Sequence, residues 1–174
     1  MSIQRPRLAL ITTFGLGNLR PAPGTWGSLP PCALAALLCI LPGGSSFLPH
    51  GTHAWVFYTL MLVILLLFSF ACVAHADDAE MHFGKKDPSN VVADETAGMA
   101  LTLCALPWFN TGAPTLALIT LAFLFFRAAD IIKPYPAYRL QSIPGGWGIL
   151  IDDLIAALYA AAMLIAFTLP MKAA

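Results

Sequence analysis

Apolar residues gather in five runs along the chain, separated by short stretches rich in proline, glycine or charged residues. The runs cover Leu29–Leu41, Ala54–Ala76, Val91–Leu106, Thr115–Ile132 and Ile149–Leu169. A helix needs about 20 apolar residues to cross the hydrocarbon core of a bilayer, so two of the runs are short and Ala54–Ala76 is the clearest span. The pattern predicts an all-α, membrane-embedded helical bundle of about five apolar helices, two of them short.

Proline and capping residues indicate where these helices begin and end. Pro30 and Pro31 suit the first turn of a helix, so a structured loop is expected before them. Asp87 and Pro88 have the character of an N-cap and a first helical residue. The third helix is therefore expected to begin there, ahead of its apolar run, and to end near Pro107.

Composition places the chain in the membrane class. Its 174 residues suit one domain, 1–174, and they are 59% hydrophobic and only 10% charged, with a mean hydropathy of +0.77. Soluble domains carry about 25% charged residues, so most of this surface is not built to face water. Nine basic residues balance nine acidic ones, which argues against a nucleic-acid partner. The sequence indicates no protein partner either, and its four cysteines are expected to be small core residues.

Charge placement separates the two ends of the expected bundle. If the five helices alternate in direction, the N-terminus and the loops 77–93 and 132–148 share one side. Nearly all basic residues then fall there: Arg5, Arg7, Arg20, Lys85, Lys86, Arg127, Lys133 and Arg139. The positive-inside rule makes this side cytoplasmic. The opposite loops, 42–53 and 107–114, contain no Asp, Glu, Lys or Arg.

Four acidic residues are expected near the beginnings of two helices on the charged side. Asp152 and Asp153 lie in the expected first turn of the last helix, and Asp94 and Glu95 lie slightly further into the third. A helix N-terminus favours negative charge, so capping and compensation of the helix dipole is the simpler interpretation of any one of these acids.

Asp130 is different, because it lies in the last turn of its helix, where a carboxylate is disfavoured. It needs a nearby cation, and Arg127 and Lys133 stand three residues before and after it, on or near the same helical face. A local ladder of ion pairs at the membrane edge is the alternative to a functional role.

Taken together, three helix ends deliver five acids to one face, and clustered carboxylates do not all stay ionised without a counter-charge. Hard oxygen ligands suit Mg²⁺, which commonly combines one or two carboxylates with water and substrate phosphate. Arg127 and Lys133 are suited to hold phosphate oxygens. The expected loop Arg20–Ser28 adds backbone N–H groups and the hydroxyls of Thr25 and Ser28. This loop is either a phosphate cradle or a tight turn that leads into the first helix.

Several phosphatase and nucleotidase motifs are absent from the sequence. No Cys is followed six residues later by Arg, and neither D-x-D-x-T nor G-x-x-x-x-G-K-[ST] occurs. The remaining chemistry is attack of a metal-activated water on a phosphate monoester, without an obvious protein nucleophile.

Four sequence blocks resemble the motifs of the phosphatidylglycerophosphatase A family, in the family's order. They are APGTWGS from Ala22, KKDPSNVVADETAG from Lys85, FRAADIIKPYP from Phe126 and GGWGILIDDLIAALYA from Gly145. The resemblance implies a small bacterial inner-membrane enzyme, Mg²⁺-dependent, that hydrolyses phosphatidylglycerophosphate to phosphatidylglycerol and inorganic phosphate, with a membrane phospholipid as its substrate.

The resemblance carries functional roles onto nine positions of this chain. They are Thr25, Asp87, Asp94, Glu95, Arg127, Asp130, Lys133, Asp152 and Asp153. It thereby adds Asp87 to the metal candidates, seven residues before Asp94 and so on the same face of the expected helix. The expected assignment is metal binding by the six acids, catalysis by Asp94, Glu95, Asp130, Arg127 and Lys133, and substrate binding by Arg20, Thr25, Ser28, Arg127 and Lys133.

Three positions depart from the family pattern, at Ala93, Ala129 and Ala157, and they change packing rather than the charged set. Two other interpretations stay open. A small ion or proton transporter would use acidic residues as a relay, but would spread them across the depth of the bilayer. A non-catalytic assembly factor would have no need for Asp130 at a disfavoured helix end.

Overall fold

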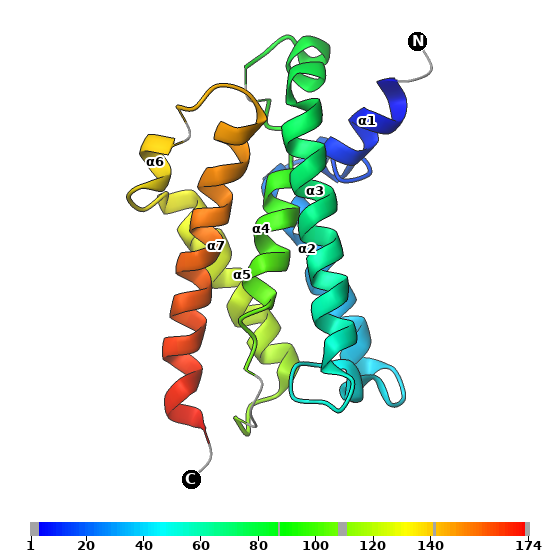
Figure 1. Cartoon of the computed structure of the whole chain (residues 1–174), viewed down its shortest axis with the longest axis vertical. Helices are drawn as coiled ribbons and strands as arrows, with labels where there is room; N and C mark the ends of the chain where they lie inside the picture. The colour runs from blue at the N-terminus through cyan, green and yellow to red at the C-terminus, as the bar shows by residue number, and fades with distance from the viewer. Residues whose placement is uncertain (1–3, 87, 108–110, 141, 173–174) are drawn as a thin grey trace.

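A computed structural model of the chain describes residues 4–86, 88–107, 111–140 and 142–172 (Figure 1). Within these ranges the protein is all-α and contains no strand. The α-helices are α1 (Gln4–Ile11), α2 (Pro23–Ile40), α3 (Ala54–Phe83), α4 (Ala93–Leu103), α5 (Thr115–Ile132), α6 (Ala137–Leu140) and α7 (Gly146–Thr168). Short 3₁₀ helices lie at Leu16–Asn18, Gly44–Phe47 and Leu169–Met171. The predicted fold class is confirmed.

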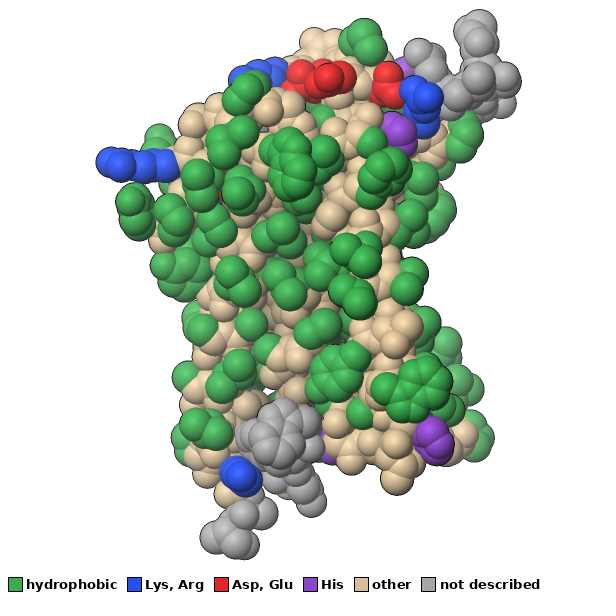
Figure 2. Space-filling view, in the orientation of Figure 1, with side chains coloured by type: hydrophobic (Ala, Val, Ile, Leu, Met, Phe, Trp, Pro, Cys, Tyr) green, Lys and Arg blue, Asp and Glu red, His purple; other side chains and the backbone are tan. Residues whose placement is uncertain are grey.

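Four helical segments are long and apolar enough to cross a membrane: Pro23–Ile40, Ala54–Phe83, Thr115–Ile132 and Gly146–Met171. Figure 2 shows a broad band of hydrophobic side chains around the middle of the molecule, with most of the acidic and basic side chains gathered at the end that carries the N-terminus. This distribution is what a bilayer requires of an embedded bundle. The four cysteines are all free; Cys32 and Cys72 are buried, as expected of core residues, and Cys39 and Cys104 are half-buried.

The shorter α4 lies inside the bundle, packed against α2, α3, α5 and α7. Its sequence explains this place, because nine of its eleven residues are buried and most of them are small. A Cβ added at Gly98 would lie 2.7 Å from the Phe126 ring of α5 and 3.1 Å from the Asp153 carbonyl of α7. Glycine therefore lets three helices meet at this level.

The expected start of α2 is wrong. The helix begins at Pro23, so Pro30 and Pro31 lie inside it, and the expected loop Arg20–Ser28 is helical over most of its length. Pro23 suits the first turn of a helix as well as Pro30 and Pro31 do, so the proline pattern alone does not decide where α2 begins. Ala22, with a φ of 55°, turns the chain immediately before Pro23, and the helix therefore begins at Pro23.

The expected start of α4 at Asp87 and Pro88 is also wrong. Residues 88–92 are not helical: the Val91 N–H donates to the Pro88 carbonyl at 2.8 Å, and the Val92 N–H donates to the Ile11 carbonyl at 3.1 Å. Because the last turn of α1 takes up the Val92 N–H, helical bonding begins only at Ala93. The helix also ends at Leu103, short of Pro107.

Two other helices are longer than the apolar runs that predicted them. α3 continues past Ala76 to Phe83, because Ala76 and Ala79 extend its buried stripe, and Gly84 then ends it with a φ of 64°. α7 begins at Gly146 instead of Ile149, which moves Asp152 and Asp153 from the expected first turn into the second. The range Thr115–Ile132 was predicted correctly.

Candidate active site

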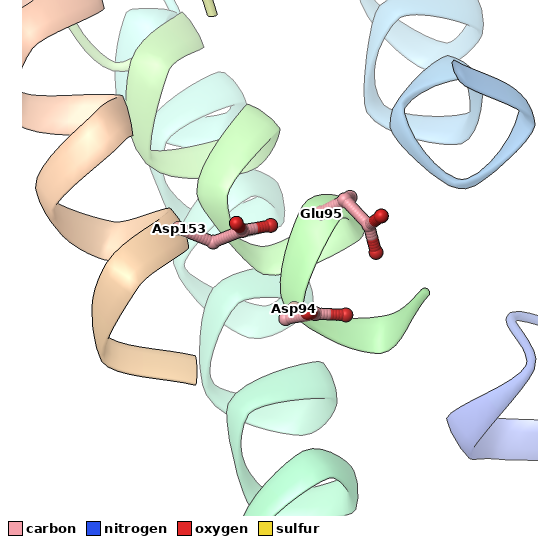
Figure 3. A group of neighbouring side chains, drawn as sticks. All are labelled: Asp94, Glu95 and Asp153. Atoms are coloured by element: carbon pink, nitrogen blue, oxygen red, sulfur yellow. The ribbon is translucent and has the colours of Figure 1, made fainter. Parts of the chain in front are cut away.

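Three carboxylates converge where α4 begins beside α7. Asp94, Glu95 and Asp153 each offer one oxygen, and these three oxygens lie within 4.8 Å of one another. Figure 3 shows the three side chains leaving α4 and α7 with their carboxylate groups on the same side. The predicted meeting of the third and last helices at one acidic site is therefore present in the fold.

The local sequence explains the spacing. Asp94 and Glu95 lie in the first turn of α4, where exposed backbone N–H groups favour negative charge. One turn further, Gly98 lets the backbone of α7 approach at Asp153. Asp94 and Asp153 are consequently buried, at 8% and 2% exposure.

Each member of this triad has one buried oxygen that accepts no hydrogen bond from the described residues: Asp94 Oδ1, Glu95 Oε2 and Asp153 Oδ2. Burying such atoms unsatisfied is costly. Carboxylate oxygens that converge within 4.8 Å of one another are ligands that a hard divalent cation prefers. The residues present therefore fit a Mg²⁺ ion, with Asp94, Glu95 and Asp153 as the group able to hold it.

Electrostatics in the first turn of α4, a helix too short to span a bilayer, support the same interpretation. Burial, followed by the charge of Glu95, raises the pKa of Asp94 well above its usual range. Burial, followed by the charge of Asp153, raises the pKa of Glu95 to about 8. The protein without a cation thus holds these acids partly protonated, and a bound cation would favour their ionised forms.

Two cations at the end of α5 contact acids next to the triad. Arg127 Nη1 lies 2.6 Å from Asp130 Oδ2, which confirms the predicted pairing of Asp130 at a helix C-terminus. Lys133 lies just past the helix, with a φ of 48°, and its amine contacts Asp152 of α7. The two acids beside the triad thus each have a basic partner, and Lys133 links α5 to α7.

The first turn of α2 completes the site on the side of Glu95. A Cβ added at Gly24 would lie 2.3 Å from Glu95 Oε1 and 3.0 Å from Arg127 Nη1. The backbone of Gly24 therefore touches both a triad acid and the arginine. Arg127 Nε is buried there without a hydrogen-bond partner among the described residues. An anion bound at this point would meet the N-terminus of a helix as well as the guanidinium.

The remaining predicted substrate-binding residues are placed differently from one another. Thr25 is half-buried and lies next to Gly24 in the first turn of α2. Arg20 is exposed, and its guanidinium contacts Ser89 Oγ at 3.5 Å. Ser28 is fully buried and donates its hydroxyl to the Gly24 carbonyl at 2.8 Å. The structure thus places the Ser28 hydroxyl on the helix backbone, and its expected contribution to a phosphate cradle stays a prediction.

A cavity of about 240 Å³ opens beside the acids. It is lined by Glu80, Lys86, Asp94, Lys133, Ile143, Gly145, Gly148, Ile149 and Asp152. Neither Glu80 nor Lys86 is among the site residues assigned from the sequence. The sequence did offer a signal for Lys86, because this residue stands in the KKDPSN block. Glu80 was expected in a polar loop, and that segment is helical in the structure. Asp87 lies outside the described residues, and residues 88–92, which precede α4, are not helical.

The fold and the site together define a class of protein: a small α-helical membrane protein with a buried carboxylate triad, and basic residues for an anion, at one end. A family model described as phosphatidylglycerophosphatase A matches residues 9–168. The chain belongs to the phosphatidylglycerophosphatase A family.

Similar curated proteins come from several bacteria. Phosphatidylglycerophosphatase A of Haemophilus influenzae is 35% identical over 92% of this chain and 87% of its own length. Phosphatidylglycerophosphatase A of Escherichia coli is 30% identical over 94% and 84%. A Bacteroides thetaiotaomicron protein, provisionally named a phosphatidylinositol-3-phosphatase, is 34% identical over 85% and 84%. No solved structure matches the chain significantly.

Proposed function

We propose that this protein hydrolyses the terminal phosphate of phosphatidylglycerophosphate, yielding phosphatidylglycerol and inorganic phosphate, and that it needs Mg²⁺. Two relatives named for this activity support the substrate. The observation that supports the metal is the triad of Asp94, Glu95 and Asp153. Their ligand oxygens lie within 4.8 Å of one another, and each residue has one oxygen that accepts no hydrogen bond from the described residues.

The proposed division of labour follows from where each side chain lies. Asp94, Glu95 and Asp153 hold the ion, which when bound would polarise the phosphate and make water a better nucleophile. Arg127 and Lys133 bind the phosphate oxygens as charge develops on them. Their neighbours Asp130 and Asp152 fix the direction of both cations.

The location of the site is part of the proposal. The basic residues gather at the end of the bundle that carries the triad, and the positive-inside rule assigns this end to the cytoplasm. The named relatives are bacterial. We therefore place the protein in the bacterial inner membrane as a multi-pass enzyme, with the site at the cytoplasmic interface and the phospholipid arriving from the membrane.

The direct test is phosphate release by the purified protein in detergent micelles. We expect turnover of phosphatidylglycerophosphate that is abolished by EDTA and restored by Mg²⁺, with far slower turnover of phosphatidic acid and of soluble glycerol 3-phosphate. Equal rates on all three substrates would contradict the proposed specificity, and full activity in EDTA would contradict the metal requirement.

One relative supports a second substrate. Because the Bacteroides protein carries a phosphatidylinositol-3-phosphatase name at 34% identity, phosphatidylinositol 3-phosphate belongs in the same assay. Faster release from this lipid than from phosphatidylglycerophosphate would reassign the substrate and leave the triad's role unchanged.

The transporter alternative has its own readout, namely ion or proton flux into sealed proteoliposomes in the absence of any phospholipid phosphate ester.

A further inference from the structure

An apolar groove lies between α2 and α5 and plays no part in the chemistry described above. It has a volume of about 510 Å³ and is lined by Leu29, Cys32, Ala33, Ala36, Leu116, Ile119, Thr120 and Phe123. Thr120 is its one hydroxyl-bearing residue, and that hydroxyl donates to the Leu116 carbonyl of its own helix at 2.9 Å. The lining therefore offers no free hydroxyl and suits a hydrocarbon ligand.

Both walls of the groove lead to the candidate active site. On α5 the lining positions 116, 119, 120 and 123 follow helical spacing, and the next residues on that stripe are Arg127 and Asp130. On α2 the lining positions 29, 32, 33 and 36 form the matching stripe, and one turn earlier it reaches Thr25. The proximity of Gly24 to Arg127 fixes the two helices as antiparallel neighbours at this end.

The length of the groove along α5 matches the hydrocarbon thickness of one bilayer leaflet. Phe123 lies one helical turn from Arg127, and Leu116 lies eleven residues from it, which is about 16 Å along the axis at 1.5 Å per residue. Half of a bilayer's hydrocarbon core is about 15 Å. A ligand in the groove would thus extend from the charged end of the bundle toward the middle of the membrane.

We propose that this groove binds an acyl chain of the phospholipid substrate and so positions its phosphate at Arg127 and Thr25. The proposal rests on the proposed lipid phosphatase function and adds the site that selects a lipid over a soluble phosphate ester. The small side chains of Ala33 and Ala36 leave space for the acyl chain. Arg127, at the end of the α5 stripe, attracts the phosphate of the same phospholipid.

The first test fills the groove. Ala33→Trp places an indole in the groove, and Ala162→Trp, at an exposed position of α7 away from it, is the matched control. The measured quantity is the ratio of kcat/KM for dioleoyl phosphatidylglycerophosphate to kcat/KM for its deacylated, water-soluble headgroup. We expect Ala33→Trp to lower this ratio at least tenfold, mainly through KM for the lipid, and Ala162→Trp to leave it within twofold. Equal ratios in the two variants would overturn the proposal.

The second test separates this inference from the proposed reaction. Wild-type protein is illuminated with phosphatidylglycerophosphate that carries a diazirine in one acyl chain, and with a phosphatidylcholine that carries the same group. Labelled peptides are then identified by mass spectrometry. We expect the first lipid to label the 29–36 and 116–123 segments at least fivefold more than the second does, with equal labelling of exposed α7 positions. Equal labelling of the groove by both lipids would refute the site even where hydrolysis is confirmed, whereas selective labelling without phosphate release would refute only the reaction.

Discussion

The two ends of this bundle are built from the same helices and differ sharply in chemistry. At one end of the bundle, a carboxylate triad and two cations come together. They are positioned by the first turns of α2 and α4, the C-terminal end of α5 and the second turn of α7. At the other end, the loops 42–53 and 107–114 carry no Asp, Glu, Lys or Arg. A cavity of about 210 Å³ there is lined mainly by apolar side chains, with Lys172 at its edge.

Helix termini alone do not make the candidate active site, because they occur at both ends of the bundle. Each end of the bundle has helix termini with unsatisfied backbone groups, but only the end with the triad brings several acidic and basic side chains together. The two ends therefore differ in the charged side chains that helix packing brings together.

The largest effect is expected from Asp153→Asn. It removes one of three convergent carboxylates and should lower kcat by about 10³-fold or more, because both metal binding and charge balance depend on it. Phosphate release and Mg²⁺ titration measure the effect. Asp77→Asn, at an exposed position on the charged end of α3, is the matched control and should retain activity. Loss of activity in both variants would mean that the charged end acts only through its overall field.

Arg127→Gln is expected to cost about 10²–10³-fold in kcat/KM, because it removes a buried donor aimed at developing charge. It also leaves Asp130 without its 2.6 Å partner. Arg139→Gln, at an exposed position of α6, removes the same charge at the same end of the bundle. Equal losses in the two variants would show that Arg127 acts through general attraction of anions.

Gly24→Ala should lower activity by about 10²-fold, because a Cβ there lies 2.3 Å from Glu95 Oε1 and a misplacement of about 1 Å in a site has a cost of this size. Alanine is well tolerated within helices, so the thermal midpoint should change little. A variant with normal activity would show that Glu95 has room to move and that the start of α2 does not confine it.

The apparent affinity for Mg²⁺ should rise with pH. Because the pKa of Glu95 is about 8 in the protein without metal, the residue is mostly protonated below that value and must lose its proton to bind the ion. The apparent Kd should fall by at least about tenfold per pH unit between pH 6 and 8, because the pKa of the neighbouring ligand Asp94 is raised as well. Calorimetric titration at four pH values measures this. A Kd that does not change over the range would contradict the raised pKa.

The smallest effect is expected at the opposite end. Lys172→Gln removes the basic side chain next to the apolar cavity there and should change kcat/KM by less than about twofold, since surface substitutions away from a site rarely matter. A large loss of phosphate release in this variant would contradict the assignment of catalysis to the end with the triad alone.

Much of the site was predictable because it depends on short-range order along the helices. Asp130 and Arg127 are three residues apart, and that spacing alone puts them on one face of a helix. The convergence of α4 and α7 followed from alternating helix directions, which bring both helix starts to the same side. Neither prediction required the details of packing.

Other parts of the site depend on contacts that no local pattern records. The start of α4 was misplaced because the Val92 N–H bonds to the Ile11 carbonyl, 81 residues away in the chain. The Ser28 hydroxyl donates to the Gly24 carbonyl because α2 begins early enough to place that carbonyl one turn before it. Glu80 was missed because α3 continues beyond its apolar run and carries this acid to the cavity.

The sequence by itself determined the class, the helical bundle and the charged end, since hydropathy and charge are properties of the residues and a bilayer separates them by polarity alone. Tertiary structure decided which three acids meet, through the close approach of α4 and α7 at Gly98. It also set the α2–α5 groove on the same helical stripe as Arg127. Both outcomes depend on how closely two helices approach, which is fixed by side chains distant in sequence rather than by the pattern within either helix.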